Sequence, residues 1–338
     1  MSRRRRCIKS KTTYEICFRA RRSLPLSAHR LMKRLIESAI ARTQRDDKVI
    51  LCHDIWNGSH THLIVKALDA EQCKNFYMEI QKKITDAVKR LLKVDHLEIW
   101  EGRPTVVELP NVDAVIVRIA YLYANPAQDD LEESIDRFPG LSSWRPFLNC
   151  LHTLDAKSEE IVPWIRLPSI QPLDSRHLSD SQDINLTRQL EKLNRKKSHK
   201  LIRRPNAWMK CFEIESDEEA KAINERIVQE VRVREEEERL RRKLAKKTVM
   251  GSARLLRQPI MKEHQPKKRE RKIFVYSTIK EIRLDRIAAA DHFEREYDRC
   301  SKEWRGGNLF VEWPPGAFRP PIPPLYNVLP YPADWVSP

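Results

Sequence analysis

Two histidines, His60 and His62, stand two residues apart in a strand-like segment directly after the pair Asn57-Gly58. Because side chains alternate between the two faces of a strand, residues i and i+2 point the same way. The two imidazoles therefore offer a pair of nitrogen ligands for a divalent metal ion. A His-x-His pair is short, and two accidental surface histidines explain it about equally well, so a metal site needs a further ligand.

The next predicted helix supplies candidates for that ligand and for a nucleophile. Tyr77 and Gln81 are four residues apart, so they share one face of this helix. Mg²⁺ and Mn²⁺ prefer oxygen ligands, so we predict that Gln81 completes a Mg or Mn site with His60 and His62. Tyr77 is the tyrosine of this helix and the candidate catalytic residue, although packing beside the apolar residue Phe76 is its more ordinary explanation.

The elements that must position these residues follow from the hydrophobic periodicity. We expect Ser27 and Asp69 to cap the first two helices, Asn57-Gly58 to form a type I′ turn, and Asn125-Pro126 to end the third helix. This order predicts an α+β fold, most simply a ferredoxin-like antiparallel sheet with helices on one face. The predicted elements are a strand at 12–19, a helix at about 27–45, strands at 48–56 and 59–66, a helix at about 69–93, a strand at 105–109 and a helix at about 112–124.

The charge of the chain points to a polyanionic partner. The 338 residues include 64 Lys and Arg against 48 Asp and Glu, a formal net charge of +16. Nucleic acid is the commonest partner for such an excess, and the charge is concentrated in residues 1–45 and 186–210. A solvated tail and a solvated helix face are the alternatives for these two segments. The predicted nucleic-acid-binding residues are Arg3, Arg4, Arg5, Arg6, Arg21, Arg22, Arg103, Lys196, Lys197, Arg203 and Arg204.

Other features limit the classes of protein to which this chain can belong. No apolar run approaches the roughly 18 residues of a membrane span, and no apolar segment follows the N-terminal arginines. The seven cysteines are scattered and nowhere spaced as C-x-x-C, which is typical of reduced thiols. We therefore expect a soluble, cytoplasmic protein without a membrane partner.

Composition predicts four parts of the chain. Residues 1–11 form a basic arm, and 12–150 hold the α+β domain with the histidines. Residues 151–250 are polar, punctuated by proline and then intensely charged, which predicts a linker and a long exposed helix. Residues 251–338 form a C-terminal extension that ends in a proline-rich tail, so the fold class includes a helical, charged C-terminal extension.

Three motifs in this order resemble those of the HUH-type single-tyrosine transposases, in particular the REP-associated tyrosine transposase group. The resemblance covers roughly residues 12–147. It implies a ferredoxin-like HUH domain that binds single-stranded or hairpin DNA, holds Mg or Mn through the two histidines, and cleaves DNA through a tyrosine during transposition and recombination of a mobile element. The motifs are Asn57-Gly58-Ser59-His60-Thr61-His62-Leu63-Ile64, Trp100-Glu101-Gly102-Arg103, and Tyr121-Leu122-Tyr123-Ala124-Asn125-Pro126 followed by Phe138-Pro139-Gly140-Leu141-Ser142-Ser143-Trp144.

The sequence departs from this family where the resemblance would put the nucleophile. Counted back from Trp100, the tyrosine should fall near residues 84–88, and this run contains none. Tyr77 lies about two turns earlier, roughly 10 Å along the helix axis, so we do not expect cleavage from it. The sequence thus predicts a divergent, transposase-like DNA-binding protein, a phosphodiester transesterase if active. A non-catalytic nucleic-acid-binding or regulatory protein derived from a transposase is the alternative, a metal-dependent hydrolase fits less well, and a homodimer stays open.

Overall fold

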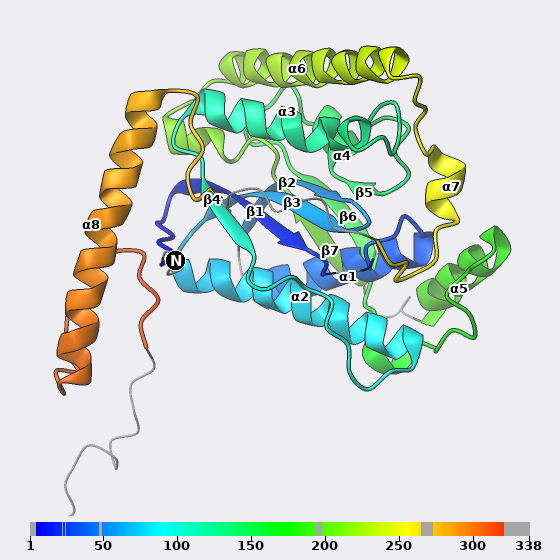
Figure 1. Ribbon diagram of the computed structural model, residues 1–338, viewed down its shortest axis with the longest axis horizontal. Coiled ribbons are helices and arrows are strands. Elements are labelled where there is room, and N and C mark those ends of the chain that lie inside the picture. Colours follow the sequence, from blue (N-terminus) through cyan, green and yellow to red (C-terminus); the bar gives the residue numbers. More distant parts are fainter. Residues whose placement is uncertain are drawn as a thin grey trace, which may run out of the picture.

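The computed structural model describes residues 5–21, 23, 25–46, 49–193, 198–264 and 273–320. Its centre is a five-stranded antiparallel sheet in the order β4-β1-β3-β2-β5 (Figure 1). The α+β class and the antiparallel sheet are thereby confirmed. The strands are β1 (Thr12–Arg19), β2 (Ile50–Trp56), β3 (His60–Ala67), β4 (Thr105–Glu108) and β5 (Leu141–Ser142).

Helices cover both faces of this sheet, not one face as the sequence predicted. In Figure 1, α1 (Arg30–Asp46) and α2 (Ala70–Leu92) lie on one side, and α3 (Val112–Gln128) and α4 (Trp144–Leu148) lie on the other. Leu63 and Val65 of β3 pack with the first pair, whereas Ile64 packs with the second. A strand buried on both faces needs a continuous apolar run, and Leu63-Ile64-Val65 is such a run.

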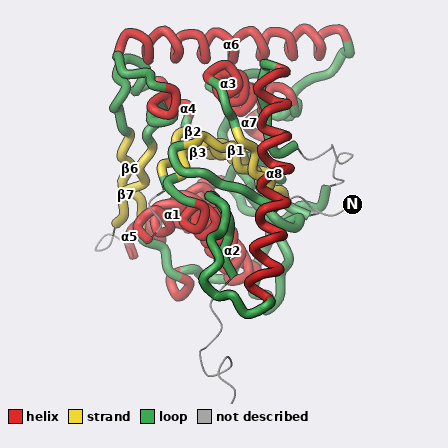
Figure 2. The backbone as a smooth tube through the Cα atoms, turned by 90° about the vertical axis from the view of Figure 1, so that its left-hand side faces the viewer, coloured by secondary structure: helices red, strands yellow, loops and turns green. Residues whose placement is uncertain are grey.

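Residues beyond 150 extend both layers. The long helix α6 (Asp217–Leu244) packs on α3 and buries Ile227 and Val231, so it is one further layer rather than an exposed helix (Figure 1). A two-stranded antiparallel sheet of β6 (Ser158–Pro163) and β7 (Ser198–Arg203) lies beside α1 (Figure 2) and contributes Val162 and Leu201 to the core. The segment expected to be a linker is therefore packed, although the predicted domain boundaries stay a prediction.

The remaining elements follow the same chain order. The last helix, α8 (Lys280–Arg305), stands at the edge of the molecule next to the N-terminal segment (Figure 1). No helix in the described ranges is long and apolar enough to cross a membrane. Besides α8, the remaining elements are the short 3₁₀ turns at Leu167–Ser169 and Met209–Phe212, α5 (Asp180–Leu193) and α7 (Ser252–Leu256).

Three local predictions need correction. The turn between β2 and β3 spans residues 57–59. It is closed by a hydrogen bond of 2.8 Å that the Asn57 N–H donates to the His60 carbonyl. Neither Asn57 nor Gly58 has the positive φ that a type I′ turn requires. The first amides of α1 are capped by the Asp183 carboxylate of α5 rather than by Ser27. Helix α3 continues through Pro126 to Gln128.

The second helix agrees with its predicted cap. Asp69 has an extended backbone, and its carboxylate accepts a hydrogen bond from the Gln72 N–H at 2.8 Å. Such a side chain satisfies one of the free amides of the first helical turn. The start of α2 is therefore predictable from local sequence alone.

Candidate functional site

His60 and His62 turn toward α3, on the same face of the sheet as Ile64. Their ring centroids are 5.2 Å apart, and the rings are nearly perpendicular. The pair is adjacent because alternate residues of β3 share one face. His60 keeps some exposure, whereas His62 is buried.

A buried carboxylate holds His62 in place. Glu15 of β1 accepts a hydrogen bond from His62 Nδ1 at 2.7 Å. The guanidinium of Arg118, from α3, donates two more hydrogen bonds to the same carboxylate, at 2.6 and 2.7 Å. Because Nδ1 donates to Glu15, a neutral His62 presents the lone pair of Nε2 to the site.

These contacts set the charge state of Glu15. Burial alone would raise the pKa of this carboxyl, but the hydrogen bond and charge of His62 and the charge of Arg118 lower it to about 2. Glu15 is therefore an anion at neutral pH. Burial and the neighbouring His62 lower the pKa of His60 to about 3, so the His60 ring is neutral and can act as a ligand.

A tyrosine from α3 completes this face. The Tyr121 ring meets the His62 ring edge-on, with centroids 5.6 Å apart. The Arg118 guanidinium carbon lies 4.3 Å from the Tyr121 ring centroid. Burial raises the pKa of Tyr121, and the charge of Arg118 opposes that rise. Tyr121 is half-buried and neutral, yet it lies beside a cation that favours its phenolate.

Polar side chains around His60 form the outer part of the site. The Asn57 amide lies 3.3 Å from His60 Nε2 and donates to Asn125 Oδ1 at 2.5 Å. The Asp129 carboxylate lies 3.9 Å from the same His60 nitrogen. Tyr121 and Asn125 of α3 and the C-cap residue Asp129 are spaced by four residues, so they face the histidines together.

Tyr77 and Gln81 do not belong to this site. Both lie on α2, which packs against the opposite face of the sheet, where Tyr77 is buried in the core. The Tyr77 hydroxyl accepts a hydrogen bond from Arg6 at 2.6 Å. The sequence-based prediction grouped Tyr77 and Gln81 with the two histidines, whereas the structure separates them, because α2 covers the other face of the sheet.

The residues that the sequence analysis missed are Tyr121, Asn125, Glu15 and Arg118. Tyr121 and Asn125 stood within a quoted motif, and their four-residue spacing was a usable signal. Glu15 and Arg118 come from elements far apart in the chain. Only the sheet order, with β1 beside β3, brings Glu15 to His62.

The described residues contain no cluster of three His, Cys, Asp or Glu side chains arranged around an ion. The lone pairs of His60 Nε2 and Asn125 Oδ1 nevertheless both point at the side-chain amide nitrogen of Asn57, which carries a partial positive charge. A metal cation in the place of this nitrogen would meet the same two lone pairs. Asn57 Oδ1 is buried and has no hydrogen-bond partner among the residues that the structure describes. Two imidazoles with amide oxygens are a donor set that fits Mn²⁺ or Mg²⁺ better than imidazoles alone.

The basic residues predicted to bind nucleic acid have different surroundings. Arg3, Arg4, Arg22, Lys196 and Lys197 lie outside the described residues. Arg103 and Arg204 are exposed, and Arg21 is exposed but paired with Glu98.

Two members of the predicted basic arm are bound within the molecule. Arg5 donates to Asp298 of α8 at 2.6 Å, and its guanidinium stacks on the Tyr297 ring. Arg6 donates to the Tyr77 hydroxyl and to the Pro104 carbonyl.

Arg203 requires a correction. Its side chain is 1% exposed, and its guanidinium donates to the fully buried Asp54 carboxylate at 2.6 and 3.3 Å. Asp54 also accepts from Trp56 Nε1 at 3.0 Å. A phosphate cannot reach this group, because the ion pair links β7 to β2 inside the core. Arg203 therefore links β7 to β2 inside the core, and we predict that it does not bind nucleic acid.

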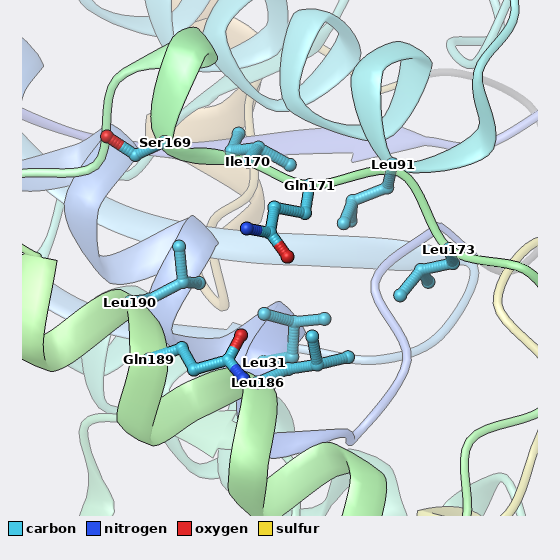
Figure 3. A pocket seen from close by; sticks show the side chains of 9 residues that line it. All are labelled: Leu31, Leu91, Ser169, Ile170, Gln171, Leu173, Leu186, Gln189 and Leu190. Carbon is cyan, nitrogen blue, oxygen red and sulfur yellow. The ribbon is translucent and has the colours of Figure 1, made fainter.

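A small cavity of about 20 Å³ lies apart from the histidine site (Figure 3). Its lining is mostly aliphatic and comes from α1, α2, α5 and the turn after β6, all away from the α3 face. The lining residues are Leu31, Leu91, Ser169, Ile170, Gln171, Leu173, Leu186, Gln189 and Leu190. This space holds at most about one water molecule and is no substrate site.

Comparisons with known proteins give one structural match. No family model matches the chain, and no curated protein matches it. A solved structure of a REP-associated tyrosine transposase bound to a REP hairpin is similar, with a TM-score of 0.38 and 20% sequence identity. The alignment covers 44% of this chain and 86% of that one.

Proposed function

We propose that this protein acts on single-stranded or hairpin DNA as a transposase-like protein, and that Tyr121 is its nucleophile. We also propose that its βαββαβ core is the ferredoxin-like arrangement that such proteins use. The contact of Tyr121 with His62 carries the proposal: a phenol stands beside two imidazoles and a cation on one face of the sheet. The net charge of +16 supports a polyanionic substrate.

The chain's own residues define the proposed step. Tyr121 loses its phenolic proton to solvent, and the positive charge of Arg118, whose guanidinium carbon lies 4.3 Å from the ring centroid, stabilises the phenolate. The phenolate oxygen attacks phosphorus, and a deoxyribose oxygen leaves and takes up a proton, so one part of the strand remains bound as a phosphotyrosine ester. Glu15 keeps Arg118 and His62 in place, and its negative charge balances the Arg118 guanidinium.

A divalent cation is part of this proposal. His60, His62 and Asn125 would hold Mg or Mn, with Asn125 in the role predicted for Gln81. The bound ion would polarise the phosphodiester that Tyr121 attacks.

A hairpin DNA in which the attacked phosphodiester is intact, and in which a nick lies further along the leaving strand, tests the proposal. The full chain with Mn²⁺ should form an adduct that survives denaturing electrophoresis, and Tyr121→Phe should abolish it. Tyr123→Phe is the matched control, because Tyr123 is on the same helix but is buried against His53 and Ser143. An adduct that persists in Tyr121→Phe would refute the assignment.

The second candidate is a non-catalytic DNA-binding protein. Burial raises the pKa of the half-buried Tyr121, and the Glu15 carboxylate is already engaged by His62 and Arg118. Both observations suit a structural role. DNA binding by the wild-type chain without any adduct, in Mn²⁺ and in Mg²⁺, would favour this candidate over cleavage.

A further inference from the structure

A second cationic site lies on the other face of the sheet. Trp164 follows β6, and three arginine guanidiniums surround its ring, with carbons at 5.5 Å (Arg42), 4.9 Å (Arg45) and 5.6 Å (Arg166) from the ring centroid. The His199 ring of β7 lies against the same indole, with centroids 3.7 Å apart. We call these five residues the Trp164 cluster.

The positive charge of the Trp164 cluster is only partly compensated. Asp46 pairs with Arg45 at 2.7 Å. Within the ranges that the structure describes, neither Arg42 nor Arg166 forms an ion pair, and Arg42 donates instead to the Ile165 carbonyl. Burial and the charges of Arg166 and Arg45 lower the pKa of Arg42, so these cations repel one another and an added anion would relieve that repulsion.

The indole adds an unused donor to this cluster. Trp164 is 8% exposed, and its buried Nε1–H has no acceptor in the described part of the chain. Buried polar groups in proteins nearly always find a partner. An anionic oxygen between the guanidiniums would supply one, while Arg45 and Arg166, both exposed, can reach an incoming ligand.

Guanidinium groups held on an aromatic ring are well suited to phosphate. Each presents a planar fork of N–H donors that matches two phosphate oxygens, and stacking limits the rotamers that must be ordered on binding. We propose that the Trp164 cluster is a second phosphate-binding site, which takes the backbone of a nucleic-acid strand.

This site is separate from the histidine site. Arg42 and Arg45 lie in the last turns of α1, on the face of the sheet opposite to α3 (Figure 1). The seven residues of β2 run from this end of the sheet to the His60 turn, about 20 Å at ~3.3 Å per residue. One strand of DNA would therefore need several nucleotides to reach both sites.

That the bound phosphate belongs to a DNA strand rests on the proposed function, whereas the existence of an anion site at the Trp164 cluster does not. A DNA strand that is processed at His60 and His62 has further phosphates that a second cationic site can hold. Free phosphate offers the same oxyanion without a neighbouring phosphate, so a strand should bind more tightly than the free ion.

The first test measures the salt dependence of binding to a single-stranded oligodeoxythymidine by the full chain. In Arg45→Gln/Arg166→Gln the plot of the logarithm of the binding constant against the logarithm of the salt concentration should become less steep. Its negative slope should shrink in magnitude by about 1.4, at about 0.7 per lost phosphate contact. The control Arg254→Gln/Arg257→Gln removes the same charge from exposed positions at α7. Equal slopes and affinities in the two double variants would overturn the proposal.

The second test does not depend on the histidine site. The indole N–H resonance of Trp164, assigned by its loss in Trp164→Phe, should shift with the oligonucleotide at a lower concentration than with inorganic phosphate. It should not shift in Arg45→Gln/Arg166→Gln. No shift with either ligand would remove the anion site, and a shift with phosphate alone would remove the nucleic acid, whether or not Tyr121 forms an adduct.

Discussion

Replacing Arg203 by methionine separates a structural role from a nucleic-acid-binding role. The change leaves Asp54, a fully buried carboxylate, without the guanidinium that holds it at 2.6 Å. Within the described ranges, the Trp56 indole at 3.0 Å is the side-chain donor to that carboxylate that remains. Removing one partner of a buried ion pair costs about 3–5 kcal/mol, because the other charge stays desolvated.

Urea unfolding at pH 7 measures this loss as a drop in the unfolding free energy. Arg204→Met is the matched control, since Arg204 is the next residue, is exposed, and should change stability by less than about 0.5 kcal/mol. DNA affinity of the folded Arg203→Met protein should equal that of the wild type.

The opposite result would refute the reasoning. If Arg203→Met kept the stability of the wild type to within about 1 kcal/mol, well below the loss expected for a broken buried pair, Asp54 would not depend on Arg203. If it also lost DNA affinity, the sequence-based prediction for Arg203 would be right. Asp54→Asn combined with Arg203→Met should be less destabilised than Arg203→Met alone, because the unpaired charge is then absent.

Three further predictions concern the histidine face and its surroundings. The pKa of Glu15 is lowered from 4.5 to about 2 on folding, so its contribution of about 3 kcal/mol to the unfolding free energy is present above pH 4.5 and is lost as the pH falls toward 2. In the wild type, urea titrations should therefore record a falling unfolding free energy between about pH 5 and pH 2, and Glu15→Gln should flatten this fall. Tyr77→Phe should cost about 1–2 kcal/mol through the lost Arg6 hydrogen bond and leave any DNA adduct unchanged on gels, and loss of the adduct would return Tyr77 to the site. Asn125→Ala should weaken Mn²⁺ binding about tenfold or more by calorimetry while Gln81→Ala leaves it unchanged, and the reverse order would contradict the assignment of the third ligand.

Local sequence was sufficient where a feature depends on neighbouring residues. The adjacency of His60 and His62 follows from strand alternation, and the start of α2 follows from Asp69. The prediction of a type I′ turn at Asn57-Gly58 was wrong, because the loop holds three residues and the Asn57 side chain contacts His60 and Asn125. Tertiary contacts therefore decided the turn.

Contacts between distant elements were beyond sequence reasoning. Asp183 caps α1 from 152 and 153 residues away in the chain, and Asp54 makes Arg203 a core residue although it stands in a basic run. The choice of Tyr77 over Tyr121 depended on which helix covers which face of the sheet. Side-chain patterns in α2 and α3 alone do not contain that information, because both helices carry an apolar stripe.

The most direct test of the central claim is to identify the residue that carries DNA. Wild-type protein is incubated with nicked hairpin DNA and Mn²⁺, then digested with nuclease and protease, and the peptides are sequenced by mass spectrometry. The account predicts a nucleotide on Tyr121 and none on Tyr77 or Tyr123. A nucleotide on either of those residues, or an unmodified Tyr121 in protein that binds the hairpin, would contradict it.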